Sequence, residues 1–280
     1  MQCIEVCGIG VMGRSIAERL IEVGHRVVLR SSGHSLDNES ELLASGAVRP
    51  NGPADILILC LPDGTAVLDV LKSVQHAPAL VIDCSSTSPA EAREAGKEVG
   101  LSGGRYVDCP VSGASALSRR GGLTAYVGAD AHDPILAQIR ALDLFRTIIA
   151  CGPVGQGMAL KLVNQAVHMV NLCALVDGAA LAGALGLDPV LTMRGLAAGS
   201  AASTMLERFG DAIFLGADKA QFSAALARKD LDNVLESWAL VPGTDGSLTM
   251  VAEAQAVVAG AIQRLGTDID VSAIGRRGCE

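Results

Sequence analysis

Lys161 lies near the start of a long apolar stretch, with three further polar side chains close behind it. Asn164 and Gln165 follow by three and four residues and His168 by one more turn, so one side of a helix would carry all four. Burial disfavours the charged form of a lysine, which would suit Lys161 to general acid or base catalysis near neutral pH. The alternatives are a lysine that extends into solvent from the helix end and, for His168, a hydrogen-bonded core histidine.

A second group of residues suited to chemistry lies near the N-terminus. The segment Gly8-Ile9-Gly10-Val11-Met12-Gly13 follows an apolar run and precedes apolar residues at helical spacing. Glycines at this spacing let the backbone turn tightly and approach a pyrophosphate, and the N–H groups at the start of the helix bind the anion. We therefore predict a dinucleotide site here; the alternative is a glycine-rich structural turn.

The next apolar run ends without the Asp or Glu that usually binds the ribose hydroxyls of NAD. Its last residues are Leu29 and Arg30, followed by Ser31 and Ser32. A cation beside small hydroxyl groups suits a 2′-phosphate, so we predict NADP as the cofactor, with NAD less favoured. The alternative is that Arg30 stacks on the adenine or faces solvent.

The elements that must position these residues fall into two halves. Up to residue 152, short runs rich in Ile, Val and Leu alternate with helical patterns, which predicts an α/β, Rossmann-like, doubly wound domain. From residue 153 to 280, Ala, Leu, Met and Gly at helical spacing predict an all-α domain that begins with a long helix. The expected strands are residues 4–7, 26–29, 56–61, 80–83, 106–108 and 123–127.

Composition narrows the classes of partner. Half of the 280 residues are apolar and the formal charge is -8, which favours a compact enzyme over a protein that binds nucleic acid or an anionic membrane. The eight cysteines form no C-x-x-C pair and the five histidines are dispersed, so we expect reduced thiols, no metal site and a cytoplasmic protein. The apolar stretch 166–187 contains His168, Asn171 and Asp177, which favours a buried helix over a membrane span.

Five segments in order resemble the 3-hydroxyisobutyrate dehydrogenase family, also called β-hydroxyacid dehydrogenases. They are the glycine turn, Asp83-Cys84-Ser85-Ser86-Thr87-Ser88-Pro89, Asp108-Cys109-Pro110-Val111-Ser112-Gly113, the segment from Gly152 through Lys161 to Asn164, and Lys229-Asp230-Leu231. Any one of these is a weak signal, but five in order, running nearly end to end, are a strong one.

The resemblance assigns roles to further residues. It implies that Leu61, Pro62, Ser85 and Ser86 line the nicotinamide and its ribose, and that Lys229 lies near the nicotinamide, although an exposed Lys-Asp pair is the alternative for Lys229. It also implies that Ser112, Gly113 and the residue after them receive a substrate carboxylate, and that Lys161 transfers the proton. Ala114 stands where a second glycine is usual. Asn164 fits the pattern, whereas Gln165 replaces an asparagine that commonly touches substrate, which could shift the accepted substrate size.

The resemblance thus implies a reversible, NADP-linked oxidoreductase acting on a short 3-hydroxy acid and its semialdehyde. Imine reductases resemble the same family but generally replace the lysine, so Lys161 argues against imine reduction. A non-catalytic NADP-binding protein is the other alternative. The apolar helical half suggests helix faces buried between subunits, so we expect a homodimer or homotetramer, although a well-packed monomer would have the same composition.

Overall fold

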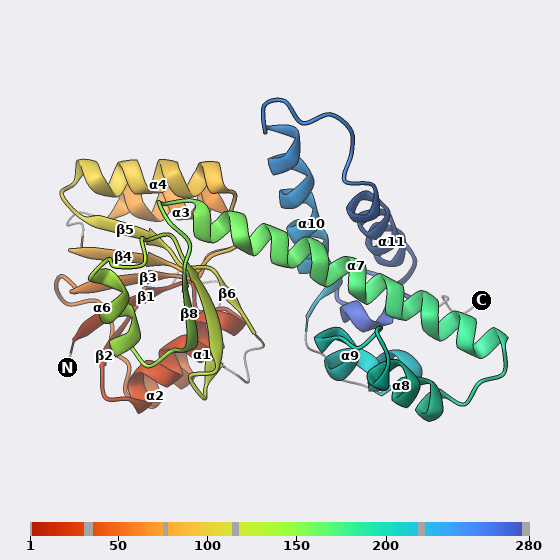
Figure 1. The fold of residues 1–280 in the computed structure, drawn as a ribbon. Helices are drawn as coiled ribbons and strands as arrows, with labels where there is room; N and C mark the ends of the chain where they lie inside the picture. The colour runs from red at the N-terminus through yellow and green to blue at the C-terminus, as the bar shows by residue number, and fades with distance from the viewer. Residues whose placement is uncertain (1, 31–35, 75–77, 114–117, 218–221, 276–280) are drawn as a thin grey trace. The chain divides into compact units, whose positions relative to one another are not determined.

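The computed structural model describes residues 2–30, 36–74, 78–113, 118–217 and 222–275. The chain divides into two compact units, Met1–Lys161 and Leu162–Glu280. The first is an α/β unit and the second is helical, which confirms the predicted fold class (Figure 1).

A five-stranded parallel sheet forms the centre of the first unit, with the strand order β2-β1-β3-β4-β5. Its strands are short and almost wholly buried, because helices cover both faces and leave no strand face to be polar. Since all the strands run in one direction, their carboxyl ends lie at one edge, where ligands bind in sheets of this kind. The strands are β1 (Cys3–Cys7), β2 (Arg26–Arg30), β3 (Ile56–Leu59), β4 (Leu80–Asp83) and β5 (Arg105–Asp108).

Helices cover the two faces of this sheet (Figure 1). One hydrophobic cluster joins Ile4 and Ile58 to Ile16 of α1 (Val11–Glu22) and Leu42 of α2 (Leu36–Ala44). A second cluster on the other face joins Leu57 and Leu59 to α3 (Gly64–Ser73) and α4 (Pro89–Leu101). The alternation of neighbouring strand residues between the two clusters follows from the two-residue period of a strand.

A smaller sheet continues the first unit, in the order β6-β7-β8. Strands β6 (Val111–Ser112) and β7 (Leu123–Val127) are antiparallel, whereas β7 and β8 (Phe145–Ala150) are parallel and joined through α6 (Ile135–Ala141). The sequence pattern predicted β7 but not β6 or β8.

Helix α7 (Gln156–Ala184) runs through the point where the two units divide. The second unit is built from α8 (Pro189–Ala198), α9 (Thr204–Phe214), α10 (Ala224–Ala239), α11 (Thr249–Leu265) and a short 3-10 turn, Val271–Ala273. Ser203 and Ser223 accept hydrogen bonds from backbone N–H groups in the first turns of α9 and α10, which fixes where these helices begin. Met169, Phe209, Leu231 and Val258 belong to the core of this unit.

The predicted domain boundary, with one domain over residues 1–152 and the next over 153–280, falls at the start of α7. The division between the compact units falls later, between Lys161 and Leu162. The physical reason is that the first turn of α7 is tied to the first unit, since Gly155 N and Met158 N donate hydrogen bonds to Asp108 of β5.

Candidate functional site

The glycine turn joins β1 to α1 and has the geometry of a phosphate cradle. Gly8 has φ 90°, and a Cβ there would overlap the carbonyl of Cys60. A Cβ at Gly13 would overlap the carbonyl of Gly8, whereas a Cβ at Gly10 would meet no described atom within 4 Å. Helix α1 begins directly after Gly10, and none of the described side chains caps its first N–H groups. The turn therefore combines open space at Gly10 with free helix donors, which fits a pyrophosphate.

A residue that the sequence pattern did not single out supports this turn from α2. Asn38 Nδ2 donates to the carbonyl of Ile9 at 2.8 Å, and Arg14 Nη1 donates to Asn38 Oδ1 at 3.0 Å. Asn38 of α2 thereby links the glycine turn to the side chain of Arg14 in α1. Its distance from the glycines in the sequence gave no signal for this role.

Arg30 is the last residue of β2 and forms an ion pair with Glu5 of β1 through its Nε. Glu5 is buried, so Arg30 serves as the counter-ion of a desolvated carboxylate. The bond uses one guanidinium nitrogen of three, and Arg30 remains partly exposed. Ser31 and Ser32, which were predicted to join it at a 2′-phosphate, lie outside the described residues.

The loops after β3 and β4 are joined by hydrogen bonds. Leu61 N donates to Ser85 Oγ at 2.9 Å, so the structure brings these two predicted cofactor residues together. Pro62 beside them is exposed and Ser86 is half-buried. Asp83, which the sequence analysis gave no role, holds this arrangement: it accepts from Ser85 N at 2.9 Å and from the Tyr106 hydroxyl at 2.7 Å. Burial raises the pKa of the Asp83 carboxyl, opposed by these hydrogen bonds.

Three cysteines follow the same strand ends, Cys60 after β3, Cys84 after β4 and Cys109 after β5. The thiol of Cys84 interacts with both of the others. The pKa of Cys60 is raised by its hydrogen bond to Cys84 and by burial. The pKa of Cys84 is raised by its hydrogen bond to Cys109 and by burial. Protonated thiols are poor nucleophiles, so Cys60 and Cys84 fill space at the edge of the sheet rather than act as nucleophiles.

Asp108, at the end of β5, anchors the start of α7. Its two carboxylate oxygens accept hydrogen bonds from Gly155 N and Met158 N, both at 2.9 Å. A Cβ at Gly128 or Gly157 would overlap this carboxylate or the backbone beside it, so glycine at both positions allows the close approach. Burial raises the pKa of Asp108, although the backbone donors oppose the shift. Asp108 therefore fixes the first turn of the helix that carries Lys161.

Lys161 lies beside the predicted substrate loop. Its Nζ donates a hydrogen bond to the carbonyl of Val111 at 2.9 Å. Val111 directly precedes Ser112 and Gly113, and Gly113 has φ 139°, a conformation that favours glycine. The structure thus brings the predicted proton donor together with two of the predicted carboxylate-binding residues; Ala114 lies outside the described residues.

The second unit holds the other predicted site residues in one hydrogen-bonded group. Gln165 is 5% exposed and its Nε2 donates to Asp230 Oδ2 at 2.6 Å. Asn164 Nδ2 donates to Gln165 Oε1 at 3.0 Å, and Lys229 Nζ lies 4.0 Å from Asp230 Oδ1. Gln165 is thus engaged at both ends of its amide, and Asp230 was named only as part of a motif.

His168 packs its ring against the edges of Phe209 and Phe222, with ring centroids 6.3 and 6.1 Å away. This environment agrees with a core histidine.

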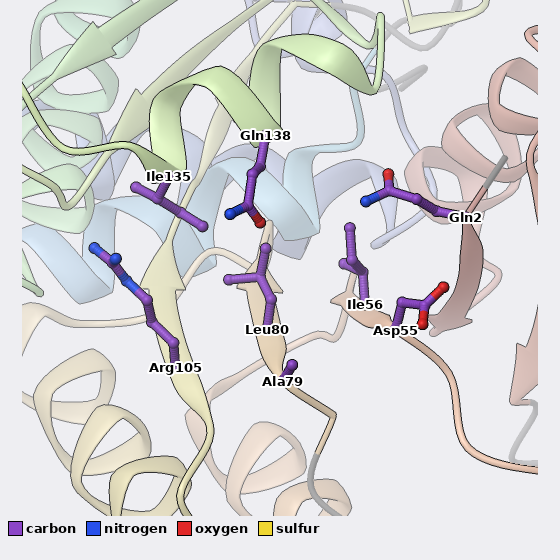
Figure 2. A pocket seen from close by; sticks show the side chains of 8 residues that line it. All are labelled: Gln2, Asp55, Ile56, Ala79, Leu80, Arg105, Ile135 and Gln138. Atoms are coloured by element: carbon purple, nitrogen blue, oxygen red, sulfur yellow. The ribbon is translucent and has the colours of Figure 1, made fainter.

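A cavity of about 370 Å³ lies in the first unit at the opposite edge of the sheet (Figure 2). Ile56, Leu80 and Arg105, which line it, are the first residues of β3, β4 and β5, whereas the glycine turn follows the carboxyl end of β1. Its charged residues have partners, since Arg105 pairs with Asp133 and Asp55 accepts from Cys3 N. The cavity is therefore separate from the candidate site. Within the described ranges, no group of three or more His, Cys, Asp or Glu side chains could hold a metal ion.

Two family models match the chain. The NAD binding domain of 6-phosphogluconate dehydrogenase matches residues 3–142, and the NAD-binding domain of NADP-dependent 3-hydroxyisobutyrate dehydrogenase matches residues 155–277. Together they cover both units.

Known proteins resemble the chain over most of its length. It is 31% identical to 2-hydroxy-3-oxopropionate reductase of Escherichia coli (strain K12) over 244 residues, 82% of each chain. It is 29% identical to mitochondrial 3-hydroxyisobutyrate dehydrogenase of Homo sapiens over 66% of this chain and 58% of that protein. Among solved structures, Mycobacterium tuberculosis 3-hydroxyisobutyrate dehydrogenase with L-serine has a TM-score of 0.85 at 26% identity, covering 98% of both chains. An imine reductase from Bacillus cereus has a TM-score of 0.62 at 18% identity, covering 98% of both chains, which shows a shared fold.

Proposed function

The chain belongs to the 3-hydroxyisobutyrate dehydrogenase family, and from this premise we propose that it interconverts a short 3-hydroxy acid and its semialdehyde with a nicotinamide cofactor. The names of two relatives support the substrate class, since one is a reductase of 2-hydroxy-3-oxopropionate and the other a dehydrogenase of 3-hydroxyisobutyrate. In both compounds the carbon two bonds from the carboxylate carbon carries the reacting oxygen, as an aldehyde in the first and as an alcohol in the second.

The observation that carries the proposal is the contact of Lys161 Nζ with the carbonyl of Val111, beside Ser112 and Gly113. We propose that the Ser112 hydroxyl and the backbone N–H groups of this loop bind the substrate carboxylate, because neutral donors orient an anion without a fixed charge. A nicotinamide cofactor whose pyrophosphate is bound at the glycine turn would supply the hydride to the carbonyl carbon, or accept it in the reverse direction.

Lys161 would supply the proton that the reduced oxygen needs. In the reducing direction its Nζ gives a proton to the carbonyl oxygen as the new C–H bond forms, and in the oxidising direction it removes the proton of the alcohol. Asp108 supports this role from a distance, because it fixes the first turn of α7 and so the starting point of the helix on which Lys161 lies.

For the cofactor we propose NADP in preference to NAD. Arg30 ends β2 where an acidic residue would bind the ribose of NAD, and the family model over residues 155–277 is that of an NADP-dependent enzyme. The open space at Gly10 and the free donors of α1 support a pyrophosphate site for either nucleotide.

The test is NADPH oxidation at 340 nm with a panel of short semialdehydes that carry a carboxylate, for the wild type, Lys161→Ala and Lys97→Ala. Lys97 is an exposed lysine of α4 and provides the matched control. We expect Lys161→Ala to lose at least about 100-fold in kcat while its Kd for NADPH stays within about twofold, and Lys97→Ala to behave as the wild type. Full activity in Lys161→Ala would remove the lysine from the chemistry.

The same panel distinguishes the two rival functions. A cyclic imine is included because imine reductases share the fold. Turnover of the imine without turnover of any semialdehyde would replace the proposal with imine reduction. Tight NADPH binding without turnover of any compound would favour a non-catalytic NADP-binding protein.

A further inference from the structure

Asn38 of α2 forms a hydrogen bond with the backbone of the glycine turn, between Gly8 and Gly10. Its Nδ2 donates to the carbonyl of Ile9 at 2.8 Å, and its Oδ1 accepts from Arg14 Nη1 at 3.0 Å. The side chain is half-buried. The turn is therefore tied to a helix that lies outside the strand–turn–helix motif to which the turn belongs.

Arg14 determines which way the amide of Asn38 faces. A guanidinium group can only donate hydrogen bonds, and each nitrogen of Arg14 has its own acceptor: Nε donates to Glu18 at 2.9 Å, Nη1 to Asn38 and Nη2 to Glu41. Asn38 must therefore present its oxygen to Arg14 and its NH₂ group to Ile9. The reverse orientation would set two donors against each other at Arg14 and two oxygens against each other at Ile9, which is unfavourable.

The hydrogen bond from Asn38 sets the direction of the next N–H group. The peptide between Ile9 and Gly10 is trans, so its C=O and N–H point to opposite sides, and the Gly10 N–H points away from Asn38. Within the described residues, no group accepts a hydrogen bond from this N–H. The carbonyl of Gly10 accepts from Arg14 N at 2.8 Å, which fixes the following peptide. Gly10 is thus held on both sides, although glycine has more backbone freedom than any other residue.

We propose that Asn38 is a positioning residue for the cofactor: oriented by Arg14, it holds the peptide between Ile9 and Gly10 so that the Gly10 N–H is presented to the pyrophosphate. This inference rests on the proposed function, in which a dinucleotide binds at the glycine turn. A turn that is already fixed in the free protein loses little conformational entropy when the cofactor binds. Without Asn38 the peptide is free to rotate, and part of the binding energy is used to order it.

The inference is tested by the Kd values of NADPH and NADH, measured by fluorescence titration, for the wild type and Asn38→Leu. Leucine has the branched shape of asparagine but cannot donate a hydrogen bond. We expect both Kd values to rise about five- to tenfold and by the same factor, because the pyrophosphate is common to the two cofactors. The KM for the cofactor should rise with Kd, whereas kcat at saturating cofactor should stay within about twofold, because the turn is ordered once the cofactor is bound.

Leu42→Val provides the matched control. Leu42 lies one turn further along α2, is 1% exposed and belongs to the core beside the sheet. Its truncation loosens the packing of α2 and leaves the Asn38 side chain in place, so we expect a lower Tm and both Kd values within about twofold of the wild type. An equal rise of the Kd values in Leu42→Val would mean that the packing of α2 alone governs binding, and would overturn the inference.

Asn38→Ala is the second variant and keeps the test decisive if Asn38→Leu does not fold. It removes the donor without adding bulk, so the same rise in both Kd values is expected. Unchanged Kd values in the folded variants would overturn the inference. A rise for NADPH alone would also overturn it, because the effect would then arise at the 2′-phosphate.

The wild type separates failure of the inference from failure of the proposed function. If it binds either cofactor but reduces no semialdehyde, the proposed reaction fails, and the Kd values still decide the role of Asn38. If it binds neither cofactor, the proposed function fails and the inference falls with it.

Discussion

Two buried carboxylates act as structural residues beside the proposed chemistry. Asp83 and Asp108 are register partners at the ends of β4 and β5. Asp83 holds the loop of Ser85, which would line the cofactor, and Asp108 holds the start of the helix that carries Lys161. A buried carboxylate is unfavourable unless it is hydrogen-bonded, and each of these binds at least two donors. The donors lie on the segments that the proposed site needs in place.

The Asp83 carboxyl predicts a pH dependence of stability. Burial raises its pKa in the folded protein above the value near 4 of an unfolded chain. The folded state therefore binds this proton more tightly, so the contribution of Asp83 is most favourable below that value and is lost as pH rises through the folded pKa. Asp83→Asn has no such proton to lose, and we expect the difference Tm(Asp83→Asn) minus Tm(wild type) to become more positive as pH rises.

Thermal unfolding of the two proteins at pH values from about 4 to 8 measures this difference. Asp108 is present in both proteins and its titration largely cancels. A difference that becomes more negative with rising pH would mean that the donors Ser85 and Tyr106 outweigh burial, so that the folded pKa of Asp83 is lowered.

Arg30 could stabilise the buried carboxylate of Glu5, bind the 2′-phosphate of NADP, or do both, and one substitution distinguishes these roles. Its ion pair with Glu5 stabilises a buried carboxylate, and its remaining guanidinium nitrogens suit a 2′-phosphate. We expect Arg30→Ala to lower Tm and also to lower the ratio of kcat/KM with NADPH to that with NADH by about tenfold or more.

Arg26→Ala is the control for this prediction, because Arg26 begins the same strand and binds Asn51 at its exposed end. The control should keep the wild-type cofactor ratio. If Arg30→Ala lowers only Tm and leaves the ratio unchanged, Arg30 serves Glu5 alone.

At the level of single residues, the sequence predicted which of the candidate residues lie near one another better than it predicted their hydrogen-bond partners. Helical spacing placed Lys161, Asn164 and Gln165 near one another, and the resemblance named the loop at Ser112. The spacing of residues in the sequence shows which of them share one face of a helix. It does not show which residues of another helix form hydrogen bonds with that face. Gln165 donates a hydrogen bond to Asp230 of α10, and the sequence gave no indication of this contact between two helices.

The unit formed by β1, the glycine turn and α1 gives a prediction at the level of elements. A Cβ at Gly13 would overlap the Gly8 carbonyl, which is backbone and cannot move aside unless α1 shifts from β1. We expect Gly13→Ala to lower the free energy of unfolding by about 1–3 kcal/mol or to prevent folding.

Gly10→Ala is the matched substitution, three residues earlier in the same turn. Gly10 has φ -65° and open space around its Cα, so alanine fits without strain and Tm should be equal to or slightly above that of the wild type. If a pyrophosphate occupies that space, the added methyl group should raise the Kd for NADPH about tenfold or more, as measured by fluorescence titration. Unchanged NADPH binding in Gly10→Ala would place the nucleotide elsewhere.

Strands could be predicted from the sequence where their residues are buried on both faces of the sheet. The five strands of the large sheet are built on short apolar runs because helices cover both faces of the sheet, and each run was recognised. Strand β8 was missed because Arg146 and Thr147 are exposed within it, which breaks the apolar run. The domain boundary was placed at a glycine and proline signal, whereas the contacts of Asp108 with Gly155 and Met158 involve residues far apart in the sequence.

At the level of the whole molecule, α7 is an apolar helix whose surface is left largely exposed by the rest of the single chain. It is the one helix in the described part of the chain that is long and apolar enough to cross a membrane by length and composition. Only 22% of its most apolar 18-residue window is buried, so the prediction of a buried helix holds for one side of it and not for the rest. Polar residues such as Asn171 and Asp177 within it, and the globular unit built on it, favour a protein partner over lipid.

Most of the large apolar side chains exposed in the described residues belong to the second unit, including Leu181, Leu185 and Leu191. Apolar side chains gathered in one part of a chain mark a protein interface, and a second copy is the partner always present at equal concentration. We therefore propose a homodimer or homotetramer in which the end of α7 and the start of α8 are covered by another subunit.

Light scattering after size-exclusion chromatography tests this proposal with two variants. We expect the double substitution Leu181→Glu and Leu185→Glu to convert the oligomer to a monomer, because the carboxylates would be buried without partners in the interface. Leu101→Glu is the control: Leu101 is 84% exposed, more than Leu181 at 61% or Leu185 at 65%, but lies in the first unit. If exposure alone governed association, the control would dissociate the protein as well; if only the α7 variant does so, the interface belongs to the second unit. A monomeric wild type would leave the exposed side of α7 without the partner proposed for it.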